Sequence, residues 1–434
     1  MSQRFFLTKK DYQTLMLASL GAMLDIYDFV IFIFLLNELS QLFFPTDLPN
    51  WLVQLQSIGI FAAGFLVRPI SGIIIGHFSD RLGRKKMFMF TIFVMALPTL
   101  CIGLLPTYQM IGIAAPLLLL TMRILQGIAI GGEIPSGWVF VAEHTPRQHR
   151  GLALGILTCG ISGGSLLGAL TLLYLKSTLD EQQMQDFGWR IPFIIGGIFG
   201  LITVYLRRYL AETPVFQQMV TKRELKDEWP IKTVIRYYWP ASIACAIMTW
   251  STASVVIAII LLLPMQLNVY MGLPGTLIFQ ANALATAMMV LGNVSFGYLN
   301  DRFGLMRTYL FSWLGIIITS YYFFSELNPN ISHQQLILSY MVIGYFAGVT
   351  VTMPILGIAL FPSSIRVSGI SLAYNLSFAL TSLITPMIIT IWSRYNIMAP
   401  AYYLIIAAIV SILTGITSRK INPRKPHNIY NTHI

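Results

Sequence analysis

The chain has 434 residues, of which 56% are hydrophobic and 10% charged, and its mean hydropathy is +0.71. Soluble domains carry about 25% charged residues, so the composition argues against a water-soluble enzyme and excludes disordered, coiled-coil and disulfide-rich secreted proteins. The net charge of +11 fits basic residues retained on the cytoplasmic side of a membrane protein, and we expect no nucleic-acid partner.

Apolar runs long enough to cross a bilayer recur along the whole chain. A span takes about 20 apolar residues, and lipid offers no partner to an unpaired backbone group, so each run is predicted to be a helix. The run at 113–142 contains Pro135, but its length suits one tilted helix. The twelve predicted spans are 14–37, 53–77, 87–105, 113–142, 151–175, 191–209, 238–264, 275–299, 308–326, 335–361, 367–392 and 400–418.

Basic residues are distributed unevenly between the two sides of the predicted membrane. With the N-terminus placed inside, 23 of the 28 lysines and arginines fall in inner segments and 3 in outer loops. The positive-inside rule then places both termini in the cytoplasm. We expect a multi-pass protein of a bacterial inner membrane.

A long polar segment, residues 210–237, divides the spans into two sets of six. The sequence GHFSDRLG (76–83) follows the second span, and GYLNDRFG (297–304) follows the eighth. Two six-helix halves repeated in the same orientation are typical of rocker-type secondary transporters. We predict an all-α membrane protein with an N-terminal half (1–209), a cytoplasmic linker (210–237), a C-terminal half (238–418) and a short cytoplasmic tail (419–434).

The first of these loops resembles the signature of the major facilitator superfamily, G-x3-D-[RK]-x-G-[RK]-[RK], which reads GHFSDRLGRK here. The second copy departs from it, because Leu305 and Met306 replace the basic pair. The segments GGE (131–133), ETPVF (212–216) and FPSSIRVSG (361–369) resemble the metabolite:proton symporters, which include proline/betaine, α-ketoglutarate, citrate and shikimate permeases. The resemblance implies the major facilitator fold and proton-coupled uptake of a small organic acid or zwitterion.

Five ionisable residues lie deep in predicted spans, all in the N-terminal half: Asp25, Asp28, Arg68, Arg123 and Glu133. Each costs at least ~2.5–3.5 kcal/mol at a helix centre, so each needs a reason to be there. Three carboxylates face two guanidiniums, and because arginine stays charged, a neutral cluster requires one carboxylate to bind a proton. This surplus acid predicts proton coupling, for which the candidates are Asp25, Asp28, Arg123 and Glu133.

The rise of an α-helix per residue gives the depth of each of these residues in the membrane, and the depths indicate which of them can form ion pairs. Arg123 and Asp28 lie about 30 Å and 26 Å from the cytoplasmic ends of their helices, so they can pair if spans one and four meet, as the resemblance implies. Glu133 and Arg68, at about 15 Å and 18 Å, form a second possible level. We expect a carboxylate on span one or four to carry the proton, with Asp28 as the first to test, while Arg123 alternates between a span-one carboxylate, foremost Asp28, and a substrate carboxylate or Glu133. Structural ion pairs between helices are the alternative for all five residues.

Five residues are candidates for substrate binding: Arg68, Arg123, Trp250, Tyr374 and Asn375. Arginine suits a carboxylate, and aromatic rings bind quaternary ammonium groups through cation–π contacts. Packing and helix–helix hydrogen bonding are the alternative roles of the last three.

The signature loop predicts a gate at the cytoplasmic end. Asp80 is expected to meet the positive N-terminus of span eleven near Arg366, and Arg84 to pair with Glu143 at the foot of span four. Such contacts exist only when the cytoplasmic side is closed, so they bias a two-state equilibrium. The alternative is a solvated basic loop. The gate candidates are Asp80, Arg81, Arg84, Glu143 and Asp301.

These observations predict a monomeric symporter that binds a small-molecule substrate and protons within the lipid bilayer. We expect no enzymatic activity and no cofactor beyond the proton gradient, and the three isolated cysteines predict no metal site. A proton-coupled efflux antiporter and a non-transporting membrane receptor are the alternatives. The glycine-rich span five lacks the Gly-Pro pair of drug:proton antiporters, which favours uptake.

Overall fold

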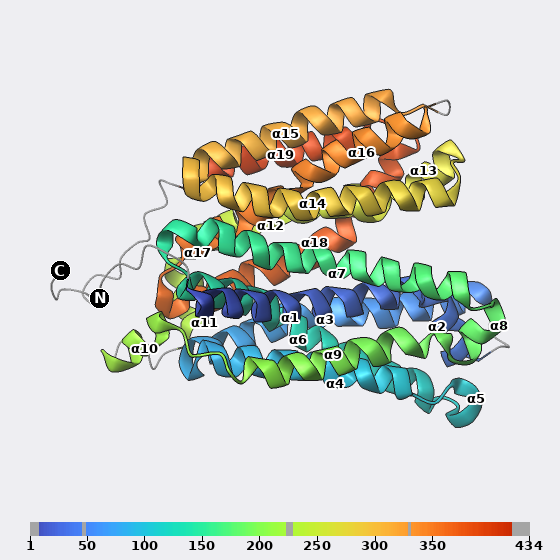
Figure 1. Ribbon diagram of the computed structural model, residues 1–434, viewed down its shortest axis with the longest axis horizontal. Coiled ribbons are helices and arrows are strands. Elements are labelled where there is room, and N and C mark those ends of the chain that lie inside the picture. The colour runs from blue at the N-terminus through green and yellow to red at the C-terminus, as the bar shows by residue number, and fades with distance from the viewer. Residues whose placement is uncertain (1–7, 46–48, 223–228, 329–330, 419–434) are drawn as a thin grey trace.

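The structure is a computed structural model, and it describes residues 8–45, 49–222, 229–328 and 331–418. Long helices run side by side to form an elongated bundle, and all regular elements of the described ranges are helical (Figure 1). The predicted tail, 419–434, lies outside these ranges. So do several basic residues used to orient the chain, namely Arg4, Arg223, Lys226, Arg419, Lys420, Arg424 and Lys425.

Six long helices form the N-terminal half, and short helices connect them. Thr8 begins the first with a capping box, in which its hydroxyl accepts from the amide of Asp11. The long helices are α1 (Lys9–Phe34), α3 (Asn50–Leu82), α4 (Arg84–Leu104), α6 (Ala114–His144), α7 (Arg150–Thr178) and α9 (Arg190–Arg207). The short ones are α2 (Leu36–Phe43), α5 (Tyr108–Ile111) and α8 (Glu181–Gln183).

The C-terminal half repeats this arrangement after the two linker helices α10 (Pro214–Thr221) and α11 (Pro230–Tyr237). Two of its spans change helix type midway, one through a π-helical turn at Ile257–Leu262 and one through a 3₁₀ turn at Gly348–Val351. Its helices are α12 (Trp239–Val256), α13 (Leu263–Met271), α14 (Gly275–Phe303), α15 (Leu305–Glu326), α16 (His333–Ala347), α17 (Thr352–Leu360), α18 (Arg366–Ser393) and α19 (Ala399–Ser418).

The described residues contain the twelve predicted spans, eleven of them strongly apolar and one less so. Within the described residues, 11 helical segments are long and apolar enough to cross a membrane. The remaining span is α15, which has 22 residues but is rich in Tyr, Ser and Thr and is correspondingly less apolar. Pro135 lies inside the continuous helix α6, which confirms one long helix there.

The two halves meet through α3 against α18 and α7 against α14. Gly151 and Gly297 sit at the second crossing, where an added Cβ on either would collide with the backbone of the other. We call the end of the bundle that contains Arg84, Arg366, α10 and α11 the basic end. In Figure 1 it lies on the left, and α2, α5 and α8 lie at the opposite end.

Candidate functional site

Besides the ionisable residues of the signature loop and its partners, six ionisable side chains of the N-terminal half are no more than 5% exposed: Asp25, Asp28, Arg68, Arg123, Glu133 and Arg207. The sequence predicted five of them and placed Arg207 in a cytoplasmic segment. Because Arg207 ends α9 with its side chain inside the bundle, three carboxylates face three guanidiniums. The predicted surplus of one acid is therefore wrong.

Asp28 and Arg123 lie at the same depth, as predicted. Arg123 Nη1 is 3.9 Å from Asp28 Oδ2. Gln126 joins them, since its Nε2 donates to Asp28 Oδ2 at 2.5 Å and its Oε1 accepts from Arg123 Nη1 at 2.8 Å. The Arg123 guanidinium also lies 4.0 Å from the ring centre of Phe32. Gln126 was not among the predicted site residues, although it lies three residues after Arg123 and therefore on the same face of one helix.

Glu133 pairs with Arg207, and no ion pair between Glu133 and Arg68 is present among the described residues. Gly131, two residues before Glu133, lies beside the backbone of Arg68, so the predicted nearness of the two helix segments stands while the partner of Glu133 is Arg207. Arg207 Nη1 lies 2.7 Å from Glu133 Oε1 and donates to the carbonyl of Phe88 at 2.8 Å. The guanidinium also stacks 3.6 Å from the Phe88 ring centre, and Thr91 donates its hydroxyl to Glu133 Oε2. Three helices, α4, α6 and α9, thus hold one ion pair.

The Arg207 guanidinium occupies space left by the missing side chain of Gly21 on α1. A Cβ at Gly21 would overlap Arg207 Nη2 and Cζ. The absence of a side chain at this position therefore allows Arg207 to reach Glu133.

We expect Gly21→Ala to displace Arg207 and weaken its pair with Glu133. A hydrogen bond to a charged group contributes about 1.5–3 kcal/mol, so the variant should lose about that much stability. Thermal unfolding of the purified protein in detergent measures this loss. Gly163→Ala is the control, because a Cβ there meets only Met23 Sδ, at 3.9 Å. Equal stability of the two variants would show that Arg207 relocates without penalty.

Asp25 and Arg68 are the two members of the cluster without an ion-pair partner among the described residues. Neither oxygen of Asp25 has a hydrogen-bond partner there, and neither do Nε and Nη2 of Arg68. The Arg68 guanidinium instead lies among aromatic rings, 4.6 Å from the centre of Phe378, 5.7 Å from Phe65 and 5.8 Å from Tyr374. Two of these rings belong to α18 of the other half, so Arg68 faces the interface between halves.

The three candidates of the C-terminal half have different surroundings. Tyr374 contacts Arg68 and also packs edge-on against Trp138 of α6, with ring centres 4.9 Å apart. Asn375 Nδ2 donates to the carbonyl of Gly131 at 2.7 Å, which ties α18 to α6. Trp250 Nε1 donates to the Tyr403 hydroxyl at 3.0 Å within its own half. Only Tyr374 therefore joins the surroundings of Arg68.

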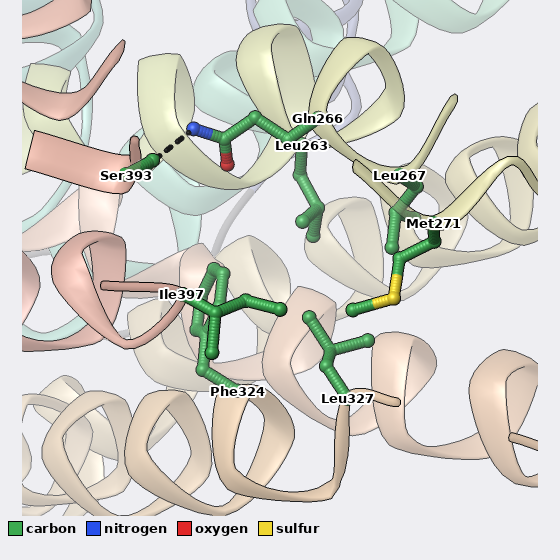
Figure 2. A pocket seen from close by; sticks show the side chains of 8 residues that line it. All are labelled: Leu263, Gln266, Leu267, Met271, Phe324, Leu327, Ser393 and Ile397. Atoms are coloured by element: carbon green, nitrogen blue, oxygen red, sulfur yellow. Dashed lines mark hydrogen bonds between the residues drawn. The ribbon is translucent and has the colours of Figure 1, made fainter. Parts of the chain in front are cut away.

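Two cavities among the described residues are small, one beside this cluster and one away from it. The one between α1, α3 and α6, lined by Phe29, Phe65, Arg68, Arg123 and Gln126 among others, has about 10 Å³. A second, in the C-terminal half between Leu263, Phe324 and Ile397, has about 20 Å³ and is mostly apolar (Figure 2). Either volume suits a single water at most. In this conformation the cavity beside Arg68 is therefore too small for an organic solute.

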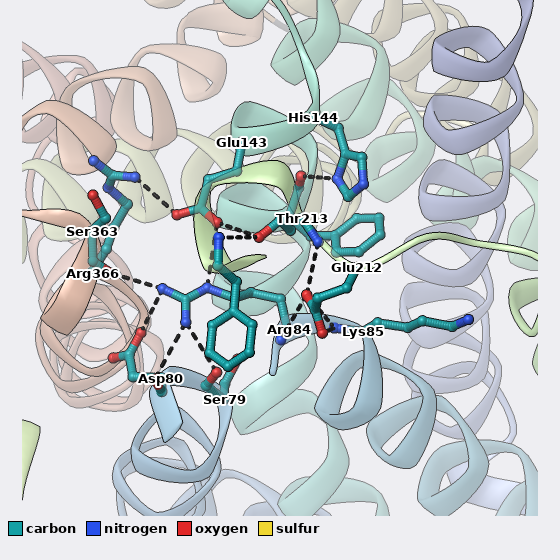
Figure 3. Close-up of polar contacts among 12 residues, drawn as sticks. Ser79, Asp80, Arg84, Lys85, Glu143, His144, Glu212, Thr213, Ser363 and Arg366 are labelled. Atoms are coloured by element: carbon teal, nitrogen blue, oxygen red, sulfur yellow. Dashed lines mark hydrogen bonds and ion pairs between the residues drawn. The ribbon is translucent and has the colours of Figure 1, made fainter. Parts of the chain in front are cut away.

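Arg84 organises a closed polar network at the basic end (Figure 3). Its guanidinium is fully buried, 3.1 Å from Asp80 Oδ1 and 3.4 Å from Glu143 Oε2. Its Nη2 donates across to the carbonyl of Ser363 at 2.7 Å. The predicted pair with Glu143 is confirmed, and the gating role of these residues stays a prediction.

Two further contacts cross between the halves in this network. Asp80 Oδ2 accepts from the amide and hydroxyl of Ser368, at 3.0 Å and 2.8 Å, in the first turn of α18. Arg366 Nη1 lies 3.0 Å from Glu143 Oε1. The predicted meeting of Asp80 with the N-terminus of span eleven is confirmed, and Arg81 is exposed outside the network.

The second copy of the loop makes the matching contact on the other side of the bundle. Asp301 accepts from the amides of Gly151 and Leu152, both at 2.7 Å, at the N-terminus of α7. An anion at a helix N-terminus satisfies unpaired amides and complements the helix dipole. Each half thus presents one aspartate to a helix N-terminus of the other half.

The linker supplies two residues that sequence reasoning missed. Thr213 donates its hydroxyl to Glu143 Oε2 at 2.8 Å. Glu212 Oε1 accepts from the amides of Arg84 and Lys85, at 3.1 Å and 3.2 Å, at the start of α4. Both lie in the segment ETPVF, whose family resemblance was the available signal.

Comparison with known proteins adds evidence independent of this geometry. The sequence pattern of the Major Facilitator Superfamily matches residues 15–386. The Proline/betaine transporter of Escherichia coli (strain K12) is 33% identical over 420 residues, covering 93% of this chain and 82% of the relative. The Glycine betaine/proline/ectoine/pipecolic acid transporter OusA of Dickeya dadantii is 32% identical over 416 residues, covering 92% and 81%.

Two solved structures share the fold. The proton:xylose symporter XylE bound to 6-bromo-6-deoxy-D-glucose superposes with a TM-score of 0.79 at 16% identity, covering 96% of this chain and 97% of that one. The partially occluded inward open conformation of XylE from E. coli gives a TM-score of 0.66 at 16% identity, covering 98% and 100%.

Proposed function

The chain belongs to the major facilitator superfamily and is a multi-pass membrane transporter of small solutes, and we propose that it imports a carboxylate-bearing solute together with protons. The solute class is a small organic acid or a zwitterion such as proline or betaine, and the names of the two relatives favour the zwitterion. Transport, and not enzymatic catalysis, is also the activity for which these relatives are named. We place the protein in a bacterial inner membrane with its basic end in the cytoplasm, which the positive-inside rule supports.

The surroundings of Arg68 carry this proposal. Its guanidinium is buried, and two of its nitrogens have no hydrogen-bond partner among the described residues. A buried guanidinium with free donors is costly unless an acceptor completes it, and a carboxylate matches its planar fork. The interface position means that a solute on Arg68 contacts both halves at once.

The aromatic rings beside Arg68 suit the other end of a zwitterion. Phe378 and Tyr374 come from α18 and Phe65 from α3. A quaternary ammonium gains about 0.5–2 kcal/mol from an aromatic face. We propose that the carboxylate of the solute binds Arg68 while its ammonium faces Phe378 and Tyr374.

Proteoliposomes with an imposed pH gradient, acidic outside, test the function. We expect accumulation of radiolabelled glycine betaine or proline that collapses when a protonophore removes the gradient. Equal uptake with and without the gradient would contradict proton coupling. Binding of neither solute by the purified protein would contradict the proposed solute class.

Arg68→Gln is expected to lower the affinity for glycine betaine about 10–100-fold, because hydrogen bonds to a charged group contribute about 1.5–3 kcal/mol. Arg394→Gln is the matched control, since Arg394 is exposed at the opposite end of the bundle. Phe378→Leu should weaken binding of glycine betaine more than binding of α-ketoglutarate, which has no cationic group. Calorimetric titration measures all three variants. Unchanged affinity in Arg68→Gln would remove Arg68 from the binding site.

A further inference from the structure

We propose that Asp25 is the residue that carries the coupled proton, because a solute carboxylate on Arg68 compensates a positive charge that otherwise favours the ionised form of Asp25. This inference rests on the proposed function and deepens it. It also narrows the sequence-based expectation, in which several carboxylates were candidates and Asp28 was the first to test.

Four of the six ionisable residues of this cluster form two ion pairs, and the other two form none among the described residues. Asp28 has Arg123 and Gln126 as partners, at 3.9 Å and 2.5 Å. Glu133 has Arg207 at 2.7 Å and the Thr91 hydroxyl. Both of these pairs lie within the N-terminal half, so each of the four groups has an opposite charge as its partner.

The two remaining groups are Asp25 and Arg68. Asp25 is 0% exposed, and neither of its oxygens is hydrogen-bonded within the described residues. Arg68 is 5% exposed and has aromatic rings in place of an anion. No ion pair or hydrogen bond between Asp25 and Arg68 is present among the described residues, so either group can gain a partner or a proton separately.

The charged groups that act on Asp25 come from three neighbouring helices and from α1 itself. They are Glu133 on α6, Arg207 on α9, Arg68 on α3 and Asp28 on α1. The other two helices packed against this region, α4 and α7, carry their charged residues only near their ends. Because Arg207 is held by Glu133, Arg68 is the cation whose state can change.

Solute binding changes that state. A solute carboxylate on Arg68 neutralises the guanidinium, and an ionised Asp25 would then leave one uncompensated negative charge among Glu133 and Asp28. A buried unpaired charge is very costly, so Asp25 takes up a proton as the solute binds. Proton and carboxylate therefore bind together, which is the requirement for symport.

The proton and charge balance of one cycle follows directly. A proton from water on the outer side forms an O–H bond with one Asp25 oxygen while the solute carboxylate pairs with Arg68. After the basic end opens, the carboxylate leaves, the charge of Arg68 is again uncompensated, and the proton passes from Asp25 to cytoplasmic water. A zwitterion thus carries one net positive charge per cycle, and a monoanion carries none.

Calorimetric titration with glycine betaine in buffers of different ionisation enthalpy counts the protons taken up on binding. In the wild type we expect uptake to approach one proton per solute toward alkaline pH, where Asp25 of the empty protein is ionised. Asp25→Asn resembles the protonated acid, so it should bind glycine betaine with no proton uptake and with an affinity that does not vary with pH. In proteoliposomes the same variant should exchange glycine betaine but not accumulate it.

Asp28→Asn is the comparison that decides between the two aspartates, since its carboxylate already has a cation. We expect it to retain uptake of one proton per bound solute. Proton uptake that persists in Asp25→Asn and disappears in Asp28→Asn would overturn the assignment and favour Asp28. Absence of binding or of proton uptake in the wild type would instead contradict the proposed function.

A second measurement covers the case in which Asp25→Asn does not fold. Infrared difference spectra of the wild type should show the carbonyl stretch of a protonated carboxylic acid when glycine betaine is added. Asp25→Glu keeps a carboxyl group at this position and should shift that band, whereas Asp28→Glu should leave it in place. A band that moves only in Asp28→Glu would overturn the proposal.

Discussion

Asp80→Ala is expected to shift the transporter toward conformations that are open at the basic end. Asp80 accepts two hydrogen bonds from Ser368 across the interface, and opening separates these atoms. The substitution therefore removes these two hydrogen bonds from the closed state alone, whereas the ion pair of Asp80 with Arg84 lies within one half and is lost from both states. Hydrogen bonds to a charged group contribute about 1.5–3 kcal/mol, so a loss of roughly 3 kcal/mol corresponds to about a 100-fold shift in the equilibrium.

Cysteine labelling measures this shift. Ser371 is fully buried on α18, and its hydroxyl lies beside Gly76 of α3, so Ser371→Cys in a background without Cys101, Cys159 and Cys245 reports separation of the halves. An impermeant maleimide should label this reporter faster in Asp80→Ala from the side of the basic end. Asp186→Ala is the control, because Asp186 is exposed at the opposite end. Identical labelling rates in the two variants would show that Asp80 does not stabilise the closed state, and the basic loop would then serve only to orient the protein in the membrane.

Asp301→Ala should act in the same direction as Asp80→Ala. Asp301 accepts two amide hydrogen bonds at the N-terminus of α7, which is the same interaction in the other half. Because the two contacts lie on opposite sides of the interface and share no partner, their effects should add.

Arg207→Met is expected to destabilise the protein strongly. The substitution removes the cation from a fully buried pair and leaves Glu133 with the Thr91 hydroxyl as its remaining hydrogen-bond partner among the described residues. Removing one member of a buried ion pair costs about 3–5 kcal/mol, which is a large part of the stability of a typical protein. We expect a clear fall in purified yield and in the midpoint of thermal unfolding in detergent.

The double variant Glu133→Gln with Arg207→Met separates pairing from packing. It removes both charges, so it should recover much of the stability that Arg207→Met loses. Arg208→Met is the matched control, because Arg208 is the next residue and is exposed. Equal losses in the single and double variants would mean that Arg207 stabilises the fold by packing on Phe88, with which it stacks.

Several contacts were predictable because they depend on helix spacing and on repeated motifs. The depth of Asp28 and Arg123 follows from a constant rise per residue, and the structure brings them within 3.9 Å. The loop motif placed Asp80 and Arg84 at the end of one helix and the start of the next, and their contacts with α18 and Glu143 followed. These predictions required only that spans one and four, and two and eleven, be neighbours.

Arg207 shows where this reasoning failed. It stands at the end of a span beside Arg208, and in a sequence both belong to a basic cytoplasmic segment. In the structure Arg208 is exposed and Arg207 is buried, because their side chains leave α9 in different directions and Gly21 of α1 opens space for only one. Hydropathy does not predict which residues at the end of a helix face a neighbouring helix and which face solvent.

The sequence by itself determined the class of protein, the twelve helices, their two-fold repetition and the identity of most buried charges. Each of these follows from composition, run length or local spacing, which are properties of a chain in a bilayer before its helices pack. Only the tertiary structure decided which charges pair, because an ion pair between helices depends on helix rotation and on gaps left by small residues. Packing thus pairs Glu133 with Arg207, and it leaves Asp25 and Arg68 without an ion-pair partner among the described residues.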